Sequence, residues 1–367
     1  METHITAAHA HSLPSFNEME QAFYHKDASY DGLFFVAVRT TKIFCRPSCA
    51  ARPKRENIEF YPSIAAAETA GYRACKRCHP AEVYGAEPSW VAALTARLAA
   101  APDAKLSSDD LRTVGVSPER ARRWFRQHRG MTLTEWWRGQ RLAAAHNELR
   151  GGASLDDVAL AHGYESHSGF REAFGRVFGV PPGQSHSSDY VAAQIIETPL
   201  GAMIAAATAE GVCMLDYADR QTLEQSYALL QQRFDGPVLP TTHPHLEQLR
   251  SELGEYFAGT RTSFGVPVVP RGTAFQERVW QALQSIPHNT TIAYDELARR
   301  IGQPTAMRAV AQANGHNRIN ILIPCHRVIG KNGQLTGYGG GVWRKRLLLE
   351  LEQTGTIQPE NTPSQRS

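Results

Sequence analysis

The sequence predicts a multidomain protein in which a small α+β domain, an all-α domain and an α/β domain follow one another along 367 residues. Three observations support this division. Two close cysteine pairs lie within the first 80 residues, two helix–turn–helix patterns follow between about 90 and 180, and strand-like apolar segments precede a run of helices after 190. A chain of this length can bury a separate core in each domain.

Breaks in composition mark where one domain ends and the next begins. The segment 181–188 predicts a linker, because adjacent prolines followed by small polar residues end a helix without starting another element. Residues 79–89 form a second connection, rich in Pro, Gly and Ala. The predicted division is a disordered segment at 1–16, domains at 17–80, 90–182, 191–270 and 271–352, and a polar disordered tail at 353–367.

Charge and cysteine content narrow the function classes. The formal net charge is only +3, but basic residues cluster at 39–55, 73–77 and 120–141, which indicates a polyanionic partner such as nucleic acid. A solvated face is the alternative for any single cluster. No apolar stretch approaches the ~18 residues of a spanning helix and no signal pattern is present, so we expect a soluble, cytoplasmic protein without a membrane partner. Because the cytoplasm is reducing, the six cysteines favour metal binding or thiol chemistry over disulfides.

The first domain carries a C-x3-C pair and a C-x2-C pair, formed by Cys45, Cys49, Cys75 and Cys78. Two close pairs at this separation predict one tetrahedral four-cysteine Zn2+ site, since each pair supplies one side of the metal. Strands are expected at 33–38 and 58–61, and so small a domain needs a metal to hold its core. A structural role alone would explain the zinc.

The segment 35–49, with 55–57 and 75–78, resembles the zinc domain of the bacterial Ada family. The resemblance implies that Cys45 accepts a methyl group from a methylphosphotriester in DNA, whereas spacing alone does not say which cysteine reacts. A Zn2+ ion with four thiolates carries a formal charge of about −2, and methylation of one thiolate reduces it to about −1. Affinity for DNA should therefore rise on methylation. Candidates for backbone contacts are Arg39, Arg46, Lys76 and Arg77.

The second domain contains two helix–turn–helix patterns. In the first, Ser117 and Pro118 cap and begin a helix that carries several arginines, after a short helix at 108–113. In the second, a helix at 154–162 is followed by a turn and by a helix capped by Ser166. A long helix that begins near Met131 connects the two units.

This arrangement, ending in 178–183, resembles the DNA-binding region of AraC-type transcription factors. The resemblance implies that two recognition helices on one rigid connecting helix enter successive major-groove segments. The candidates for DNA contact are Arg120, Arg123, His167 and Arg171.

The third part of the chain is expected to begin with a hairpin near 195–203 and a strand at 212–216, in which Cys213 is a core residue. Helices are expected at about 220–234, 244–258, 273–285, 294–301 and 305–315. The motif Cys325-His326 follows in an apolar frame. It predicts a nucleophile, because the imidazole or a bridging water can take the thiol proton.

Residues 290–294, 308–310, 323–328 and 336–338, with Asn317 and Glu352, resemble the O6-alkylguanine-DNA alkyltransferase family. The resemblance implies an RNase H-like sheet subdomain at 191–270 and a winged-helix-like catalytic subdomain at 271–352. A departure from many relatives is Arg318, which stands where they have proline, so the stiffness of this turn stays open.

The same resemblance assigns roles to individual residues. Cys325 would accept the alkyl group, His326 would be its base through a water, and Glu352 would orient the imidazole. The base would have to be flipped out of the duplex. Tyr294 would press on the phosphate of the flipped nucleotide and Arg308 would fill the space it leaves. Asn317 would brace the turn before the motif, while Tyr338 and the backbone of 339–341 would line the guanine pocket.

Together these patterns predict a single-turnover DNA-repair methyltransferase. Methyl groups from O6-methylguanine and O4-methylthymine would pass to Cys325, and those from methylphosphotriesters to Cys45. The form methylated at Cys45 would activate transcription in an adaptive response, with RNA polymerase as a partner of a monomeric protein. Two alternatives remain open: an AraC-type regulator that senses zinc or redox state without methyl transfer, and a Cys-His-Glu hydrolase, which needs an oxyanion hole.

Overall fold

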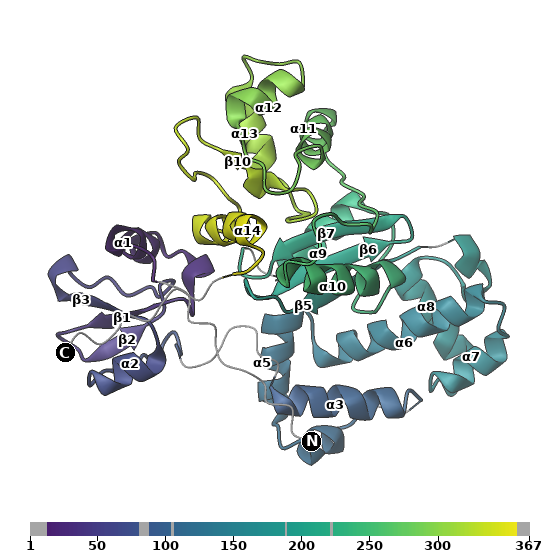
Figure 1. The fold of residues 1–367 in the computed structure, drawn as a ribbon. Coiled ribbons are helices and arrows are strands. Elements are labelled where there is room, and N and C mark those ends of the chain that lie inside the picture. Colours follow the sequence, from purple (N-terminus) through teal and green to yellow (C-terminus); the bar gives the residue numbers. More distant parts are fainter. Residues whose placement is uncertain (1–12, 81–87, 104–105, 188, 221–222, 358–367) are drawn as a thin grey trace.

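The computed structural model describes residues 13–80, 88–103, 106–187, 189–220 and 223–357. Figure 1 shows the zinc-type domain in purple and blue, the helical domain in blue and teal, and the third part of the chain in green and yellow. Residues 1–12 and 358–367 of the predicted disordered ends lie outside the described residues. The predicted fold class, a small α+β domain followed by a helical and an α/β domain, is confirmed.

Each of the two segments predicted to be disordered overlaps the end of a helix by one or two residues. Helix α1, Phe16–His25, begins within the predicted disordered segment because the Ser15 hydroxyl accepts a hydrogen bond from the Glu18 amide. Helix α14, Val342–Thr354, continues past 352 until Gly355 caps it in the left-handed conformation. Local capping contacts, which composition does not reveal, decide both boundaries.

A four-stranded sheet forms the first domain, in the order β3-β1-β2-β4. Strands β1, Phe35–Val38, and β3, Ile58–Tyr61, are antiparallel, as are β1 and β2, Ile43–Cys45. Strand β4, Arg73–Ala74, runs parallel to β2, and the Cys75 amide donates to the Phe44 carbonyl. This pairing brings the two cysteine pairs together. The short helices are η1, Ala28–Tyr30, η2, Arg55–Asn57, and α2, Ile64–Thr69.

The described part of the second domain contains six α-helices, and both helix–turn–helix units are present. Trp90 and Phe125 anchor the core of the first unit, and Phe170 and Phe174 that of the second. The connecting helix begins at a Thr132–Glu135 capping box. The helices are α3, Ser89–Ala100, α4, Ser108–Thr113, α5, Pro118–Arg129, α6, Leu133–Arg150, α7, Leu155–Ala161, and α8, His167–Phe178.

The expected linker at 181–188 is wrong in one respect. Residues Pro182–Ser187 form the 3-10 element η3, two short turns with a kink at Gln184, so an element does start at Pro182. Proline is well suited to the first position of a helix, because its missing N–H would be unpaired there in any case. Ser185 is buried, and η3 packs against α6 and α8. Packing therefore supplies the stability that the local sequence lacks.

A second four-stranded sheet opens the third part of the chain, in the order β7-β6-β5-β8. Helix α10, Pro244–Phe257, packs on β6 and β7. Cys213 is buried in β7, as predicted, and burial raises its pKa to about 12. The bounds are β5, Val191–Ile196, β6, Met203–Thr208, β7, Gly211–Tyr217, α9, Leu223–Arg233, and β8, Val238–Leu239.

The catalytic-type subdomain is largely helical and stands above this sheet in Figure 1. Its short strands β9, Ile292–Ala293, and β10, Val328–Ile329, are parallel. Helices α11, α12 and α13 contact one another, and α14 contacts the one-turn helix η4. The bounds are α11, Ala274–Gln284, α12, Tyr294–Arg300, α13, Met307–Gly315, and η4, Cys325–Arg327.

Side chains and backbone of different domains contact one another. Trp343 of α14 donates from Nε1 to the Ser29 carbonyl at 3.0 Å, and Arg346 pairs with Glu18 at 3.3 Å. Helix α6 approaches β8 so closely at Gly139 that a Cβ there would lie 2.7 Å from Pro240 Cδ. None of the described helices combines the length and apolar character needed to cross a membrane.

Candidate functional site

The four cysteines of the first domain form one cluster. Their sulfur atoms all lie within 4.8 Å of one another, with Cys45 and Cys49 buried. Four sulfurs at about 2.3 Å from a tetrahedral Zn2+ ion are about 3.8 Å apart, so this donor set fits zinc. A hydrogen bond between the Cys45 and Cys78 thiols raises the pKa of Cys45 and lowers that of Cys78 to about 5. Neighbouring thiols cannot all ionise without a cation, and a divalent metal supplies it.

Removal of zinc is expected to unfold the first domain. On the side of its sheet next to β4 the apolar cluster is small, built on Phe35, Phe44 and Tyr72, and the parallel β2–β4 pairing has only two registered residue pairs. The other side, with Phe34 and Val36, packs into the large core shared with the third part of the chain. Hydrogen exchange on the full chain after chelation should show loss of protection across β1 to β4, while β5 to β7 stay protected. Readdition of zinc should restore it. Unchanged protection of β1 to β4 in zinc-free protein would contradict a structural metal.

The basic residues predicted to contact DNA from this domain differ in exposure. Arg39 is exposed and lies 3.7 Å from Glu59, and Lys76 and Arg77 are exposed beside the cluster. Arg46 is buried, with its guanidinium donating to the His79 carbonyl at 2.6 Å. Sequence alone could not separate Arg46 from its neighbours, because burial depends on the loop that the cysteines fold.

Cys325, the second predicted methyl acceptor, begins η4 and is 2% exposed. Asn317 holds it, because Nδ2 donates to the Cys325 Sγ at 3.1 Å and to the Ile323 carbonyl at 2.8 Å. Burial raises the pKa of this thiol, and the Asn317 bond opposes the rise. Ile321 has a φ of 72°, which is unfavourable for a β-branched residue and marks a strained turn just before the thiol.

The next residue, His326, is buried completely and contacts Glu352. Its Nε2 atom lies 2.8 Å from Glu352 Oε1. Hydrogen bonds from His326 and Arg327 hold the pKa of Glu352 well below its ordinary value, although burial opposes them. An ionised carboxylate only accepts, so Nε2 carries the proton. Burial lowers the pKa of His326, and its buried Nδ1 atom has no hydrogen-bond partner among the described residues. Nδ1 is thus a free acceptor next to Cys325 in the chain.

Several residues around this pair were missed by the sequence reasoning. The Tyr256 hydroxyl donates to Glu352 at 2.9 Å, and Arg327 donates to both carboxylate oxygens. Asn320 accepts from the Cys325 thiol at 3.7 Å. Arg327 lies within the segment 323–328 that carries the reactive thiol, so its proximity to the site could have been predicted. Tyr256 lies 96 positions from Glu352, and no local pattern indicates that the two are in contact.

A surface cleft of about 430 Å³ lies near this region, because Tyr294 and Tyr338, which line it, both interact electrostatically with Cys325. Tyr294, Arg308 and Tyr338 line it together with the backbone at Gly337 and Gly339. Arg308 is exposed on α13, and the Tyr294 hydroxyl donates to the Gly337 carbonyl at 3.4 Å. Burial raises the pKa of Tyr338 well above its ordinary value, so this phenol stays protonated. Of the residues predicted for the guanine pocket, Tyr338 and Gly339 line this cleft, whereas Gly340 and Gly341 do not.

The turn that carries Arg318 is fixed by β7. Arg318 donates to Asp216 at 3.0 Å, and its carbonyl accepts from the Leu215 amide at 2.8 Å. Asn320 Nδ2 donates to the same carboxylate at 2.7 Å. An ion pair with the sheet thus anchors this turn where proline would act through a restricted φ angle.

A buried lysine near the thiol predicts a measurable pH effect. Lys345 donates to the Val328 and Thr336 carbonyls, and burial lowers its pKa to about 8 from an ordinary 10.5. A cation whose folded pKa is lowered destabilises the fold below that pKa, and the penalty disappears as pH rises toward the unfolded value. Between about pH 7 and about pH 9.5, the wild type should gain about 2 kcal/mol relative to Lys345→Met.

Urea unfolding of both proteins across that range measures this difference. Taking the difference between variants removes the contributions of other titrating groups, which both proteins share. A difference that stays constant with pH would contradict a lowered pKa at Lys345.

The helix–turn–helix residues proposed for DNA contact all lie at the surface. Arg120 and Arg123 are exposed on α5, and His167 and Arg171 on α8. His167 lies 3.2 Å from Asp156 of α7. None of these four side chains packs in the core, which is formed by the aromatic residues of the same two helices.

Comparisons with known proteins cover all of these regions. Residues 18–81 match the metal binding domain of Ada, and 111–187 match a helix-turn-helix domain. Residues 191–270 and 274–354 match the ribonuclease-like domain and the DNA binding domain of 6-O-methylguanine DNA methyltransferase.

Three relatives illustrate the similarity. The Escherichia coli bifunctional transcriptional activator/DNA repair enzyme Ada is 35% identical over 344 residues, which cover 90% of this chain and 95% of that protein. The constitutive methylated-DNA–protein-cysteine methyltransferase of Bacillus subtilis is 40% identical over 161 residues, 43% of this chain and 92% of its own. The structure of Mycobacterium tuberculosis OGT in complex with DNA is 40% identical, covers 46% of this chain and 96% of that chain, and has a TM-score of 0.40.

These matches decide between the readings that the sequence left open. The four-cysteine cluster is a zinc site, and the last two domains are those of a methylated-DNA–protein-cysteine methyltransferase. Because the similarity to the Escherichia coli protein extends over nearly the whole of both sequences, the chain belongs to the Ada family of DNA-repair methyltransferases and transcriptional activators.

Proposed function

We propose that Cys325 accepts methyl groups from O6-methylguanine and O4-methylthymine in DNA. The observation that carries this proposal is the buried Cys325, His326 and Glu352 arrangement near a cleft lined by Tyr294, Arg308 and Tyr338. An exocyclic oxygen is inaccessible in stacked DNA, so the base must be flipped into that cleft. Arg308 is exposed on α13 and can occupy the gap left in the duplex.

The proposed step is an in-line displacement. The Cys325 sulfur forms a bond to the methyl carbon as the bond from that carbon to guanine O6 breaks. The thiol proton passes through a water to the free Nδ1 of His326, while Glu352 keeps Nε2–H in place. Guanine leaves as the neutral base when it takes a proton from the Tyr338 phenol, and Tyr338 is reprotonated through water by the His326 imidazolium, so the thiol proton ends on the base. No described group is placed to cleave the resulting thioether, so each site acts once.

We further propose that Cys45 accepts a methyl group from a DNA methylphosphotriester. Zinc, when bound by Cys45, Cys49, Cys75 and Cys78, keeps these sulfurs deprotonated at neutral pH. The Cys45 sulfur forms a bond to the methyl carbon, the carbon–oxygen bond breaks, and an ordinary phosphodiester leaves. Methylation removes one negative charge from the cysteine cluster beside the exposed Lys76 and Arg77, which favours DNA binding.

The proposed DNA-binding surface combines residues of the zinc domain with residues of the helix–turn–helix domain. We propose that Arg39, Lys76 and Arg77, together with Arg46 once it is released from His79, contact the backbone, and that Arg120, Arg123, His167 and Arg171 meet promoter DNA from α5 and α8. The methylated protein would act in the cytoplasm as a monomer that recruits RNA polymerase to repair genes, including its own.

Mass spectrometry tests both acceptor assignments. The zinc-loaded chain is incubated with duplex DNA that is methylated at guanine O6 and at backbone phosphates, then digested. Peptides that contain Cys325 and Cys45 should each gain one methylene unit, and the peptide with buried Cys213 should not. Absence of methyl at both cysteines would favour a zinc- or redox-sensing regulator instead. Methyl at only one would reject the other assignment.

The switch is tested separately through Cys45→Ala. In the wild type, exposure to methylphosphotriester DNA should raise affinity for a duplex selected in vitro from random sequences, more strongly at low salt. The variant should lose this increase. Full methylation-dependent binding by Cys45→Ala would show that the switch lies elsewhere.

A further inference from the structure

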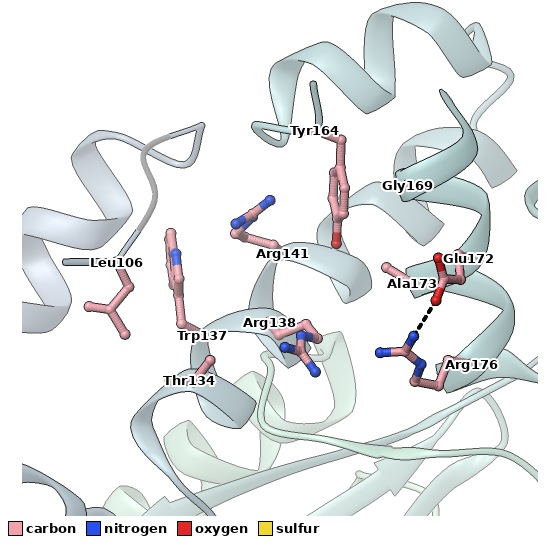
Figure 2. Close-up of a pocket in the computed structure, with 10 residues that line it drawn as sticks. All are labelled: Leu106, Thr134, Trp137, Arg138, Arg141, Tyr164, Gly169, Glu172, Ala173 and Arg176. Carbon is pink, nitrogen blue, oxygen red and sulfur yellow. Dashed lines mark hydrogen bonds and ion pairs between the residues drawn. The ribbon is translucent and has the colours of Figure 1, made fainter. Parts of the chain in front are cut away.

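A cleft between the two helix–turn–helix units is not used by either acceptor site. It has a volume of about 460 Å³ and is open to solvent. Figure 2 shows that α6 contributes Trp137, Arg138 and Arg141, while Glu172 and Arg176 come from α8. Tyr164, in the turn before α8, projects into the same space. Three of the lining side chains are therefore cations.

The positive charge in this cleft is only partly balanced by direct ion pairs. Glu172 is the single lining carboxylate, and it already pairs with Arg176. Neither Arg138 nor Arg141 forms an ion pair with any residue that the structure describes. Arg141 is half-buried over the Tyr164 ring, at 4.8 Å, and bonds only to the His162 carbonyl. The Asp103 carboxylate acts on Arg141 only through space, as Glu135 does on Arg138, and neither forms a direct pair. A half-buried cation without a directly paired carboxylate is stabilised when an anion joins it.

Two buried donors point to the same kind of ligand. Trp137 is 7% exposed, and its Nε1 atom has no acceptor among the described residues. The buried Arg141 Nε atom likewise has no acceptor among the described residues. Buried N–H groups normally find partners, so unsatisfied donors beside two unpaired guanidinium groups indicate an oxygen-rich anion.

We propose that this cleft binds a phosphate of the DNA backbone, a proposal that rests on promoter binding by this domain. Recognition helices α5 and α8 are joined by α6, so when they enter successive major-groove segments the strand between them must cross α6. Arg138 and Arg141 lie on α6 beside α8. The cleft is also too open for a small ligand, which a binding pocket normally encloses on most sides. Arg138 and Arg141 would neutralise the phosphate and Trp137 would fix its position.

The test measures DNA affinity of the full zinc-loaded chain as a function of salt, by fluorescence anisotropy with two labelled duplexes. One duplex is the in vitro selected sequence and the other is unrelated, because a phosphate contact is independent of sequence. Arg138→Gln should weaken binding to both about tenfold and reduce the slope of log K against log salt by about one. Arg141→Gln should do the same. Trp137→Phe should weaken binding about threefold with an unchanged slope, since only a neutral donor is lost.

The matched control is Arg150→Gln, at the far end of α6, where the arginine pairs with Asp189 at 2.8 Å outside the cleft. It should leave the slope unchanged. Arg138 is exposed, so its variant folds even if Arg141→Gln proves unstable by thermal denaturation.

A wild-type slope in Arg138→Gln on both duplexes would overturn the proposal. So would perturbation of the Trp137 indole resonance by inorganic phosphate without any slope change, which would mark a small-anion site. If methylation failed to raise wild-type affinity but the slopes still fell in the variants, the phosphate site would stand and only the switch would be lost.

Discussion

Replacing Cys325 with serine is expected to reduce methyl transfer from O6-methylguanine DNA by at least about 10⁴-fold, the scale seen when an enzyme loses its nucleophile. A hydroxyl is far less acidic than a thiol, and burial disfavours the anion further. Asn317, His326 and Glu352 would remain in place without a competent nucleophile. Single-turnover assays with radiolabelled methyl groups measure the rate.

Transfer to Cys45 supplies the matched control. Cys325→Ser should accept methyl groups from phosphotriesters at the wild-type rate, because the zinc cluster and η4 belong to different domains. Cys45→Ser should show the reverse pattern. If either single variant lost both activities while remaining folded, the two acceptor sites would not be independent.

Replacing Glu352 with alanine should lower both stability and rate. The carboxylate joins His326, Arg327 and Tyr256 in a buried network, and its removal leaves the Arg327 cation without a partner. Loss of one member of a buried ion pair costs about 3–5 kcal/mol. The low pKa of Glu352 means that this stabilisation is complete at neutral pH and is lost only as pH falls through the folded value. Loss of an oriented base should also slow transfer about 10²- to 10⁴-fold.

Urea unfolding at neutral pH and single-turnover kinetics separate the two effects. Glu352→Gln keeps the volume and one acceptor for His326, so it should retain more stability than Glu352→Ala while still losing the charge. A variant that kept wild-type rates at temperatures where it is folded would contradict the role of Glu352 in orienting His326.

Local patterns were enough for most of the secondary structure and for the reactive groups. Strand β3 and the short helix α4 were predicted to the residue, because a short segment rich in β-branched and aromatic residues and a capped polar segment are decided within a few positions. The four zinc ligands were evident from spacing. The linker before β5 was mistaken for irregular structure, because η3 is stabilised by α6 and α8 rather than by its own residues.

The sequence by itself determined which atoms can react, since a thiol beside an imidazole and a four-thiol cluster carry their chemistry in the residue types. Tertiary structure alone decided what surrounds those atoms. It buried Arg46, joined Tyr256 and Arg327 to Glu352, and left Arg138 and Arg141 without a direct ion pair among the described residues. These properties depend on burial and on contacts between segments distant in the chain, and the strength of a charge or a hydrogen bond follows from its surroundings rather than from its neighbours in sequence.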